Sequence, residues 1–354
     1  MTPEEIVGFI VTPNKEAFKA ATIANLVLKQ PTFSANWFKR QKQKLVQQSI
    51  GRNKVVLGIG WSLSREIMMP NHSYKNYYSL LPLAELKSFE LETIKKWHQT
   101  AFATDGVTIV ATGTTDVQQL GEAIDKALEG LPTKQAKFVH RTLKINVPGK
   151  VVIFHAPKAS KSMILTFGKA PAAKARQDVY LNTALGVLGY GKRSRLFKAV
   201  RTGLRASYGF RAGYIDYTRN QRLFHMSGEV ETSKLQAGLD TVRQTYNEFR
   251  KDGIGFIEFP FARRYYRQRI EASLLKPRDA AYLLMNGRMN GASLNDFTSL
   301  STQIDNMSRD QVNKFIKKEF APFNQLLTII VTPNATAVKG DCIITAYDQW
   351  KSCF

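Results

Sequence analysis

The sequence predicts an α+β fold in which helices cover a largely antiparallel sheet. Apolar, β-branched runs typical of strands occur in both halves of the chain, separated by segments with apolar positions at helical spacing. Strand runs and helix runs follow one another in blocks, which is typical of α+β layers. The 354 residues, 44% of them hydrophobic, suffice for about two domains with real cores, so a globally disordered chain is excluded.

In the first part of the chain, prolines and capping residues separate the expected elements. Strands are expected at 7–13 and 106–113, and helices at 15–30, 35–52, 88–102 and 115–131. Residues 71–86 are rich in Asn, Tyr, Ser and Pro and are expected to be irregular. A polar, basic, proline-containing stretch then follows, and we expect residues 136–149 to be a linker.

The second part of the chain carries a longer series of expected elements. Strands are expected at 150–157, 161–170 and 326–334, and helices at 176–190, 232–253, 260–276 and 308–320. Between 191 and 230, a glycine turn leads into a basic helix and then into two alternating aromatic strands that turn around residues 216–220. This part has every element that a complete sheet-and-helix unit needs.

The chain contains an internal duplication. The segment LETIKKWHQTAFATDGVTIVATG matches RDQVNKFIKKEFAPFNQLLTIIVTP, and the strand–helix–helix segment 7–49 matches 224–273. Both matches are offset by about 220 residues, which is the size of a domain rather than of a solenoid repeat. The first copy has no counterpart of residues 150–217.

The duplication predicts the domain boundaries. Residues 1–135 are expected to be the C-terminal half of a first domain that is truncated at its N-terminus. Residues 150–354 are expected to form a complete second domain of the same α+β kind.

Residues that could carry metal or nucleophilic chemistry are sparse. The five histidines, His72, His98, His140, His155 and His225, include no pair four residues apart, and the HxxEH pattern of a zinc-binding helix is missing. No activated nucleophile is visible, so we expect no catalytic residue and no metal ligand in this chain. Cys342 and Cys353 fit either one disulfide near the C-terminus or two free thiols.

The charge is strongly positive. Lys and Arg number 51 against 28 Asp and Glu, for a net charge of +23, which is typical of a protein with an anionic partner. Basic and aromatic residues alternate between Lys192 and Arg211, but no nucleic-acid motif is present, so a solvated helix face is favoured over nucleic-acid binding. No apolar run reaches the roughly 18 residues of a membrane span.

The segment after the helix at 176–190 reads LGxGxxSRLFxxVR and continues into SYGFRAG and two strands. This order resembles the C-terminal domain of the M16 (insulinase/pitrilysin-like) metallopeptidases, which include the mitochondrial processing peptidase. The matching residues are Leu188, Gly189, Gly191, Ser194, Arg195, Leu196, Phe197, Arg201 and Tyr208. The sequence departs from the family pattern at Lys192 and Arg193, and its Gly203-Leu204 stands two places early.

The resemblance implies roles for these residues. Arg201 and Tyr208 correspond to the family's Arg and Tyr that hold the substrate backbone, while Gly189, Gly191, Ser194 and Arg195 form its glycine turn. A guanidinium and a phenol can both donate to a peptide carbonyl. The family's zinc ligands belong to the half-domain that has no counterpart here. Zinc is therefore expected only in a catalytic partner or in a missing N-terminal half.

The resulting functional hypothesis is a non-catalytic, peptide-binding M16-like chain. It would pair with a zinc-bearing M16 chain or with itself. A basic protein that binds nucleic acid or another anionic surface, and a purely structural subunit, are the alternatives. The periplasm or envelope of a bacterium is the expected location, with the mitochondrial matrix and the cytoplasm left open. An acidic partner chain or an acidic peptide is the first explanation of the charge to test.

Overall fold

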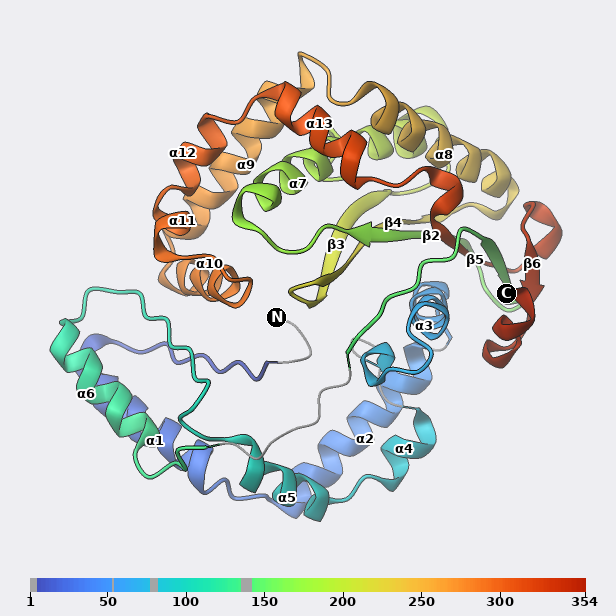
Figure 1. The fold of residues 1–354 in the computed structure, drawn as a ribbon. Coiled ribbons are helices and arrows are strands. Elements are labelled where there is room, and N and C mark those ends of the chain that lie inside the picture. Colours follow the sequence, from blue (N-terminus) through green and yellow to red (C-terminus); the bar gives the residue numbers. More distant parts are fainter. Residues whose placement is uncertain (1–4, 53, 77–81, 135–141) are drawn as a thin grey trace.

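A mixed six-stranded sheet forms the centre of the protein (Figure 1). The computed structural model describes residues 5–52, 54–76, 82–134 and 142–354. The strands are β1 (Val151–His155), β2 (Ser162–Ala170), β3 (Arg211–Thr218), β4 (Gln221–Val230), β5 (Leu327–Thr332) and β6 (Cys342–Ile344). Their order in the sheet is β3-β4-β2-β5-β1-β6. The α+β class predicted from the sequence is therefore confirmed.

The pairing of the strands places β2 at the centre of an antiparallel set. β2 runs antiparallel to both β4 and β5, and β3 runs antiparallel to β4. β1 is parallel to β5 and β6, so the sheet is mixed, with three of its five pairings antiparallel. β2 is buried on both faces along most of its length, as expected of a central strand covered on both sides.

Helices of the second part cover one face of the sheet. They are α7 (Ala175–Leu188), α8 (Leu235–Asp252), α9 (Glu258–Leu274), α10 (Pro277–Met289), α11 (Leu294–Thr298), α12 (Leu300–Asp305) and α13 (Arg309–Glu319). Apolar side chains of α7, α8 and α13 meet those of β4, β2 and β5 in one continuous core. The sequence indicated α7, α8, α9 and α13 but not α10, α11 or α12.

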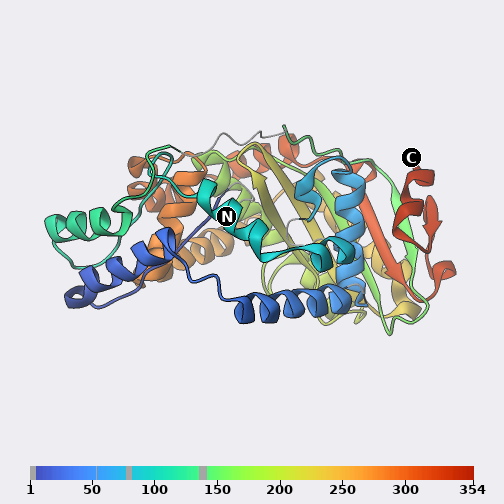
Figure 2. The ribbon, with the colours of Figure 1, turned by 90° about the horizontal axis from the view of Figure 1, so that it is seen from below.

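The opposite face of the sheet is covered by a helix from the first part of the chain. That helix, α3 (Val56–Met68), lies across the sheet in Figure 2 and packs on β2 and β5. A Cβ at Gly60 would lie 2.3 Å from Leu165 Cδ1, so any larger residue would force the Leu165 side chain to move. Leu143 and Ile145 join the same core. Helix α3, Leu143 and Ile145 thus share a core with the sheet formed by residues 151–344. The domain boundaries at 135 and 150 stay a prediction.

The other helices of the first part form an arc away from the sheet (Figure 1). They are α1 (Ala17–Lys29), α2 (Ala35–Arg52), α4 (Leu83–Ser88), α5 (Leu91–Ala101) and α6 (Val117–Leu128). α1 packs on α6, and the Asn25 amide there donates to the carbonyls of Ala127 and Glu129. Few side chains of the arc are buried, which identifies it as a thin layer rather than a core.

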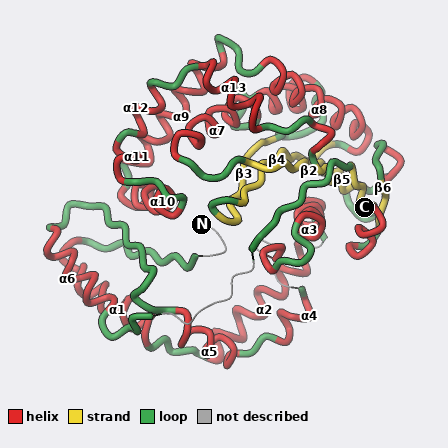
Figure 3. Tube along the Cα trace, viewed as in Figure 1, coloured by secondary structure: helices red, strands yellow, loops and turns green. Residues whose placement is uncertain are grey.

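The two strands predicted in the first part are not formed. Segments 7–13 and 106–113 are loops, drawn green in Figure 3. Their apolar side chains are exposed: Ile10 is 57% and Val11 77% accessible. The prediction of strands at these two segments was therefore wrong.

The duplication explains why these strands are missing. Segment 7–13 matches part of β4 and segment 107–112 matches β5, and β2 hydrogen-bonds to both of those strands in the second copy. The described residues contain no first-copy counterpart of β2. Without that central strand, neither segment is paired with another strand among the described residues, so an apolar, β-branched sequence alone does not make a strand.

Two further observations concern the ends of the fold. Cys342 and Cys353 form a disulfide across 5.6 Å between their Cα atoms, which selects the first of the two alternatives left by the sequence. Along the described residues, no helix is long and apolar enough to cross a membrane.

A histidine in the sheet makes stability depend on pH. His225 on β4 contacts the Trp61 ring of α3, and its Nδ1 is shielded from solvent with no hydrogen-bond partner among the described residues. Burial lowers the pKa of His225 to about 4, from an ordinary value near 6.5. Between these two values the unfolded chain binds the extra proton and the folded chain does not.

We therefore expect the free energy of unfolding to fall by about 2 kcal/mol as the pH drops from 6.5 to 4. Urea denaturation across this range measures the effect. The His225→Gln variant lacks the titrating group, so its stability should fall less over the same interval. Equal slopes for the two proteins would contradict the prediction.

Candidate functional site

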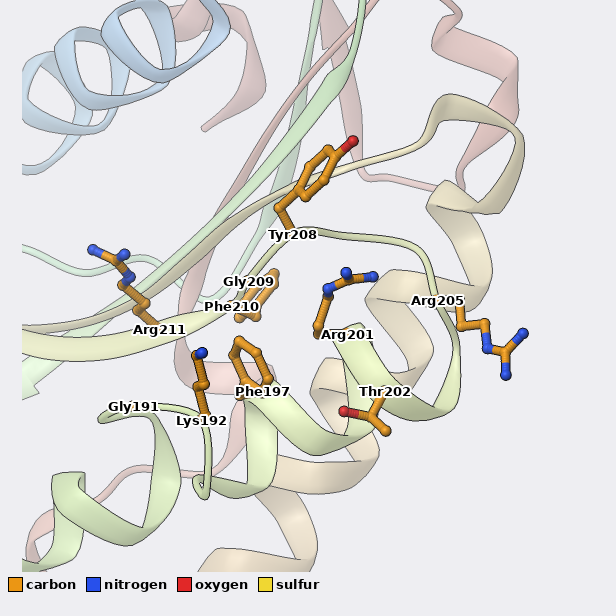
Figure 4. Close-up of a pocket in the computed structure, with 10 residues that line it drawn as sticks. All are labelled: Gly191, Lys192, Phe197, Arg201, Thr202, Arg205, Tyr208, Gly209, Phe210 and Arg211. Carbon is orange, nitrogen blue, oxygen red and sulfur yellow. The ribbon is translucent and has the colours of Figure 1, made fainter.

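A pocket of about 740 Å³ lies where the chain passes from α7 to the edge strand β3. Figure 4 shows the ten residues that line it. They are Gly191, Lys192, Phe197, Arg201, Thr202, Arg205, Tyr208, Gly209, Phe210 and Arg211. All of them come from one continuous stretch of sequence, so the local path of the chain determines the shape of the pocket.

The glycine turn after α7 brings this stretch close to the sheet. A Cβ on Gly189 would lie 2.1 Å from the backbone nitrogen of Ala212 in β3, so no larger residue fits without moving the backbone. Gly191 has a φ of +76°, in the left-handed region that glycine adopts without strain. The Ser194 hydroxyl then donates to the Gly191 carbonyl at 2.8 Å and closes the turn.

Arg195 anchors the turn to the rest of the molecule. Its Nε and Nη2 donate to the two carboxylate oxygens of Glu258 at 2.8 and 2.5 Å, and Nη2 also donates to the Gly253 carbonyl. Burial raises the pKa of Glu258, but the hydrogen bonds from Arg195 and from the Gly255 N–H outweigh it, and the net result is a lowered pKa. A bidentate pair of this kind fixes orientation as well as adding energy, so Arg195 is a structural residue.

A π-helical segment, Phe197–Gly203, carries the next residues of the pocket. Leu196 and Val200 are fully buried and hold one side of the segment on the core. Arg201 lies on the opposite, exposed side. π-Helical turns often occur at functional sites, because the wider turn re-aims the side chains that follow it.

Arg201 and Tyr208, the predicted substrate-binding pair, lie together. The Arg201 guanidinium carbon lies 5.5 Å from the centre of the Tyr208 ring, and Lys161 Nζ lies 5.3 Å from the same centre. Tyr208 is 82% exposed, so it is not a core aromatic. An aromatic ring that has two cations close to its centre and is open to solvent can offer its hydroxyl to a bound ligand.

The loop between Arg201 and Tyr208 is held by backbone contacts. Arg205 has a φ of +52°, an uncommon conformation for a residue other than glycine. Lys234 Nζ donates to the Arg205 carbonyl, and the Glu231 N–H donates to the Ala206 carbonyl. The Ser207 hydroxyl accepts from the Gly209 N–H. These contacts position Tyr208 at the rim of the pocket.

The predicted site residues thus divide into two groups. Arg201, Tyr208 and Gly191 line the pocket, while Gly189, Ser194 and Arg195 lie behind it and shape the turn. Sequence reasoning assigned the neighbouring basic residues to a solvated helix face. The structure instead places Lys192, Arg205 and Arg211 around the same pocket as Arg201. The alternation of basic and aromatic residues over 192–211 was the signal that could have indicated them.

The described residues show no group of three or more His, Cys, Asp or Glu side chains arranged to hold a metal ion. Two carboxylates that lie close together, Asp178 and Asp216, both pair with Arg222. Asp216, which the sequence placed at the hairpin of β3 and β4, accepts from the Arg222 guanidinium at 2.5 Å. What the pocket offers is therefore hydrogen-bond donors and positive charge.

Comparison with known proteins agrees with this fold and motif. Residues 88–264, half of the chain, match the family model of the peptidase M16 inactive domain. The chain therefore belongs to the M16 peptidase family and resembles its inactive type. No curated protein matches the chain.

Solved structures share the fold at low sequence identity. A protease from Helicobacter pylori is 16% identical with a TM-score of 0.78, covering 91% of this chain and 78% of that one. An M16 inactive domain from Pseudomonas fluorescens is 18% identical with a TM-score of 0.75, covering 92% and 76%. The periplasmic protease PqqL of Escherichia coli is 11% identical with a TM-score of 0.66, covering 92% of this chain and 37% of PqqL. At such identities the likeness concerns the fold alone.

Proposed function

We propose that this chain is a non-catalytic, peptide-binding member of the M16 family. The observation that carries the proposal is the exposed pair of Arg201 and Tyr208 at the rim of the pocket. A guanidinium and a phenol at this spacing can donate to the carbonyls of one extended peptide. The zinc that hydrolysis requires would come from a catalytic M16 partner or from a half-domain preceding these residues.

The sheet beside the pocket supports a peptide ligand. β3 is an edge strand that pairs with β4 on one side, and its first residue, Arg211, lines the pocket. At the start of this edge the Ala212 N–H already donates to the Gly189 carbonyl at 3.4 Å. An extended peptide would therefore pair with β3 beyond Ala212, while the neighbouring pocket reads its side chains. The pocket and the strand edge together suit an extended polypeptide better than a small, globular ligand.

The exposed apolar residues of the first part support pairing with another polypeptide. Ile10, Val11 and Ile109 are each at least 46% exposed on segments that match strands of the second copy. Apolar side chains clustered on unpaired backbone are typical of a surface that a partner covers. We propose a zinc-bearing M16 chain as that partner, with self-association as the alternative, and a periplasmic location like that of PqqL.

Peptide binding by the purified chain tests the central proposal. We expect Arg201→Ala to weaken the binding of a fluorescein-labelled extended peptide, measured by anisotropy, by about tenfold, because a charged hydrogen bond is lost. Tyr208→Phe should weaken it by a few fold, since only the hydroxyl is removed. Arg264→Ala and Tyr265→Phe on the exposed surface of α9 are matched controls that should leave binding unchanged.

Two results would contradict the proposal. Unchanged affinity in both pocket variants would exclude the Arg201–Tyr208 pair from peptide binding. Stoichiometric zinc in the isolated chain, together with peptide hydrolysis, would show that it is a complete enzyme. Metal analysis and a peptidase assay of the same preparation measure the second result.

A further inference from the structure

The pocket carries a concentration of positive charge without any carboxylate to balance it. Four of its ten lining residues are cations, namely Lys192, Arg201, Arg205 and Arg211, and the lining contains no Asp or Glu. All four side chains are exposed. Such a surface attracts an anionic ligand and raises the rate at which it is captured.

Carboxylates on the neighbouring segments are paired with other cations. Glu229 contacts Lys161 at 3.2 Å, Glu231 contacts Lys234 at 3.8 Å, and Glu258 holds Arg195. These ion pairs neutralise the residues around the pocket rather than the four cations that line it. The charge of the pocket is therefore available to a ligand.

The positions of the four cations suit a ligand with several separate charges. In Figure 4, Arg201 lies in the middle. Lys192 and Arg211 lie on one side of it, and Arg205 lies on the other side. An extended peptide along β3 would pass Arg211 and then Arg201, with alternate side chains pointing to the same face. Carboxylate side chains are the peptide groups that pair with guanidinium and ammonium ions at such spacings.

From this we infer that the pocket selects peptides rich in Glu and Asp. The inference rests on the proposed peptide-binding function and names the substrate class of that site. Arg201 and Tyr208 hold the backbone of any peptide, whereas Lys192, Arg205 and Arg211 discriminate between peptides by charge. The same cations reject basic peptides, because each Lys or Arg of the ligand meets a like charge.

A single-stranded nucleic acid is also anionic, but the aromatic residues of the pocket favour a peptide. Nucleic-acid sites of this kind depend on several exposed rings on which successive bases stack. Here Phe210 is fully buried and Phe197 is partly buried, so Tyr208 is the one fully exposed ring among the lining residues. One ring is insufficient for a run of stacked bases.

The test compares three fluorescein-labelled peptides of one extended sequence of about twelve residues. One peptide carries several Glu, the second carries Gln at those positions, and the third carries Lys. At about 0.05 M salt we expect the Glu peptide to bind about tenfold more tightly than the Gln peptide, and the Lys peptide to bind most weakly. The advantage of Glu should shrink at about 0.5 M salt, because exposed charges are screened.

A double variant that removes two cations of the pocket tests whether these side chains cause the preference for Glu over Gln. Lys192→Gln with Arg211→Gln should reduce the preference for Glu over Gln several fold, because the Glu peptide loses more affinity than the Gln peptide. Lys314→Gln with Lys317→Gln on the exposed surface of α13 removes the same charge elsewhere and should keep the preference intact. A uniform effect of both double variants would indicate net charge rather than this pocket, and would overturn the inference.

The remaining outcomes distinguish the acidic selectivity from the proposed peptide-binding function on which it rests. Equal binding of the Glu and Gln peptides, with Arg201→Ala still weakening both, would overturn the acidic selectivity and leave the peptide-binding function standing. Failure of all three peptides to bind would overturn both. A single-stranded oligodeoxynucleotide could bind more tightly than the Glu peptide and lose this binding in the Lys192/Arg211 variant. That result would identify nucleic acid, rather than an acidic peptide, as the ligand of the pocket.

Discussion

Replacing Arg222 by Met is expected to lower the free energy of unfolding by about 3–5 kcal/mol. The Arg222 side chain on β4 has no exposed surface and bridges two carboxylates. Its Nη1 donates to Asp178 in the first turn of α7 at 2.6 Å, and its Nε donates to Asp216 on β3 at 2.5 Å. A Met in its place would leave two largely buried carboxylates without their cation.

The surroundings of Arg222 are poorly solvated. Its Nη1 also donates to the Pro171 carbonyl, and its guanidinium lies 4.4 Å from the centre of the Tyr214 ring. Burial is the main reason that the pKa of Asp178 is raised even with Arg222 in place. The same burial raises the pKa of Tyr214 to about 12. Both shifts indicate a poorly solvated site, where an unpaired carboxylate is costly.

Urea denaturation of the Arg222→Met protein measures this effect. Arg219→Met, an exposed position in the same hairpin, is the matched control and should change stability by less than about 0.5 kcal/mol. Adding Asp178→Asn and Asp216→Asn to Arg222→Met should recover part of the lost free energy of unfolding, because it removes the two unpaired carboxylate charges. A loss below about 1 kcal/mol for Arg222→Met would show that the network contributes little to folding.

The second large effect is expected at Gly189 in the turn that shapes the pocket. Gly189→Ala should lower the free energy of unfolding by about 3 kcal/mol, because the new Cβ would lie 2.1 Å from the backbone nitrogen of Ala212. A backbone atom cannot rotate away as a side chain can. Relief of the overlap would move the turn away from β3 and shift Arg211, so peptide affinity should fall as well.

Gly186→Ala, one turn earlier in α7, is a close control for this substitution. A Cβ at Gly186 would have its nearest neighbour, Ala262 Cβ, at 4.0 Å, so there is room for it. Alanine also favours helix over glycine by about 1 kcal/mol, so this variant should be as stable as the parent or more so. Thermal melts of both variants and anisotropy with the same peptide compare them. Similar losses at the two positions would mean that close approach to β3 is not the cause.

Local sequence patterns were sufficient for most helices and for the strands of the complete sheet. The apolar spacing of residues 35–52, with Ser34 before them, and of residues 308–320 predicted α2 and α13 closely, because helix periodicity is encoded within a few residues. Helix α3 was not predicted, because its two glycines, Gly58 and Gly60, weaken the local helix signal. That its apolar residues pack on the sheet is shown only by the tertiary structure.

The candidate site was predictable in part for a similar reason. Arg201 and Tyr208 follow a motif with fixed spacing, so resemblance to the M16 family was enough to select them. Lys192, Arg205 and Arg211 fit a solvated surface equally well until the turn at Gly189 and the π-helical segment bring them around one pocket. Convergence of side chains depends on the path of the backbone, which a list of basic residues does not describe.

The sequence by itself indicated the α+β class and the M16 family, both of which are confirmed, and it predicts an internal duplication, because each rests on residue pattern and order. Only the tertiary structure decided which apolar segments become strands. β5 (Leu327–Thr332) is a strand because β2 and β1 hydrogen-bond to it, whereas the matching segment 107–112 is an exposed loop. The physical reason is that a strand is completed by hydrogen bonds from other parts of the chain, while a helix satisfies its own backbone.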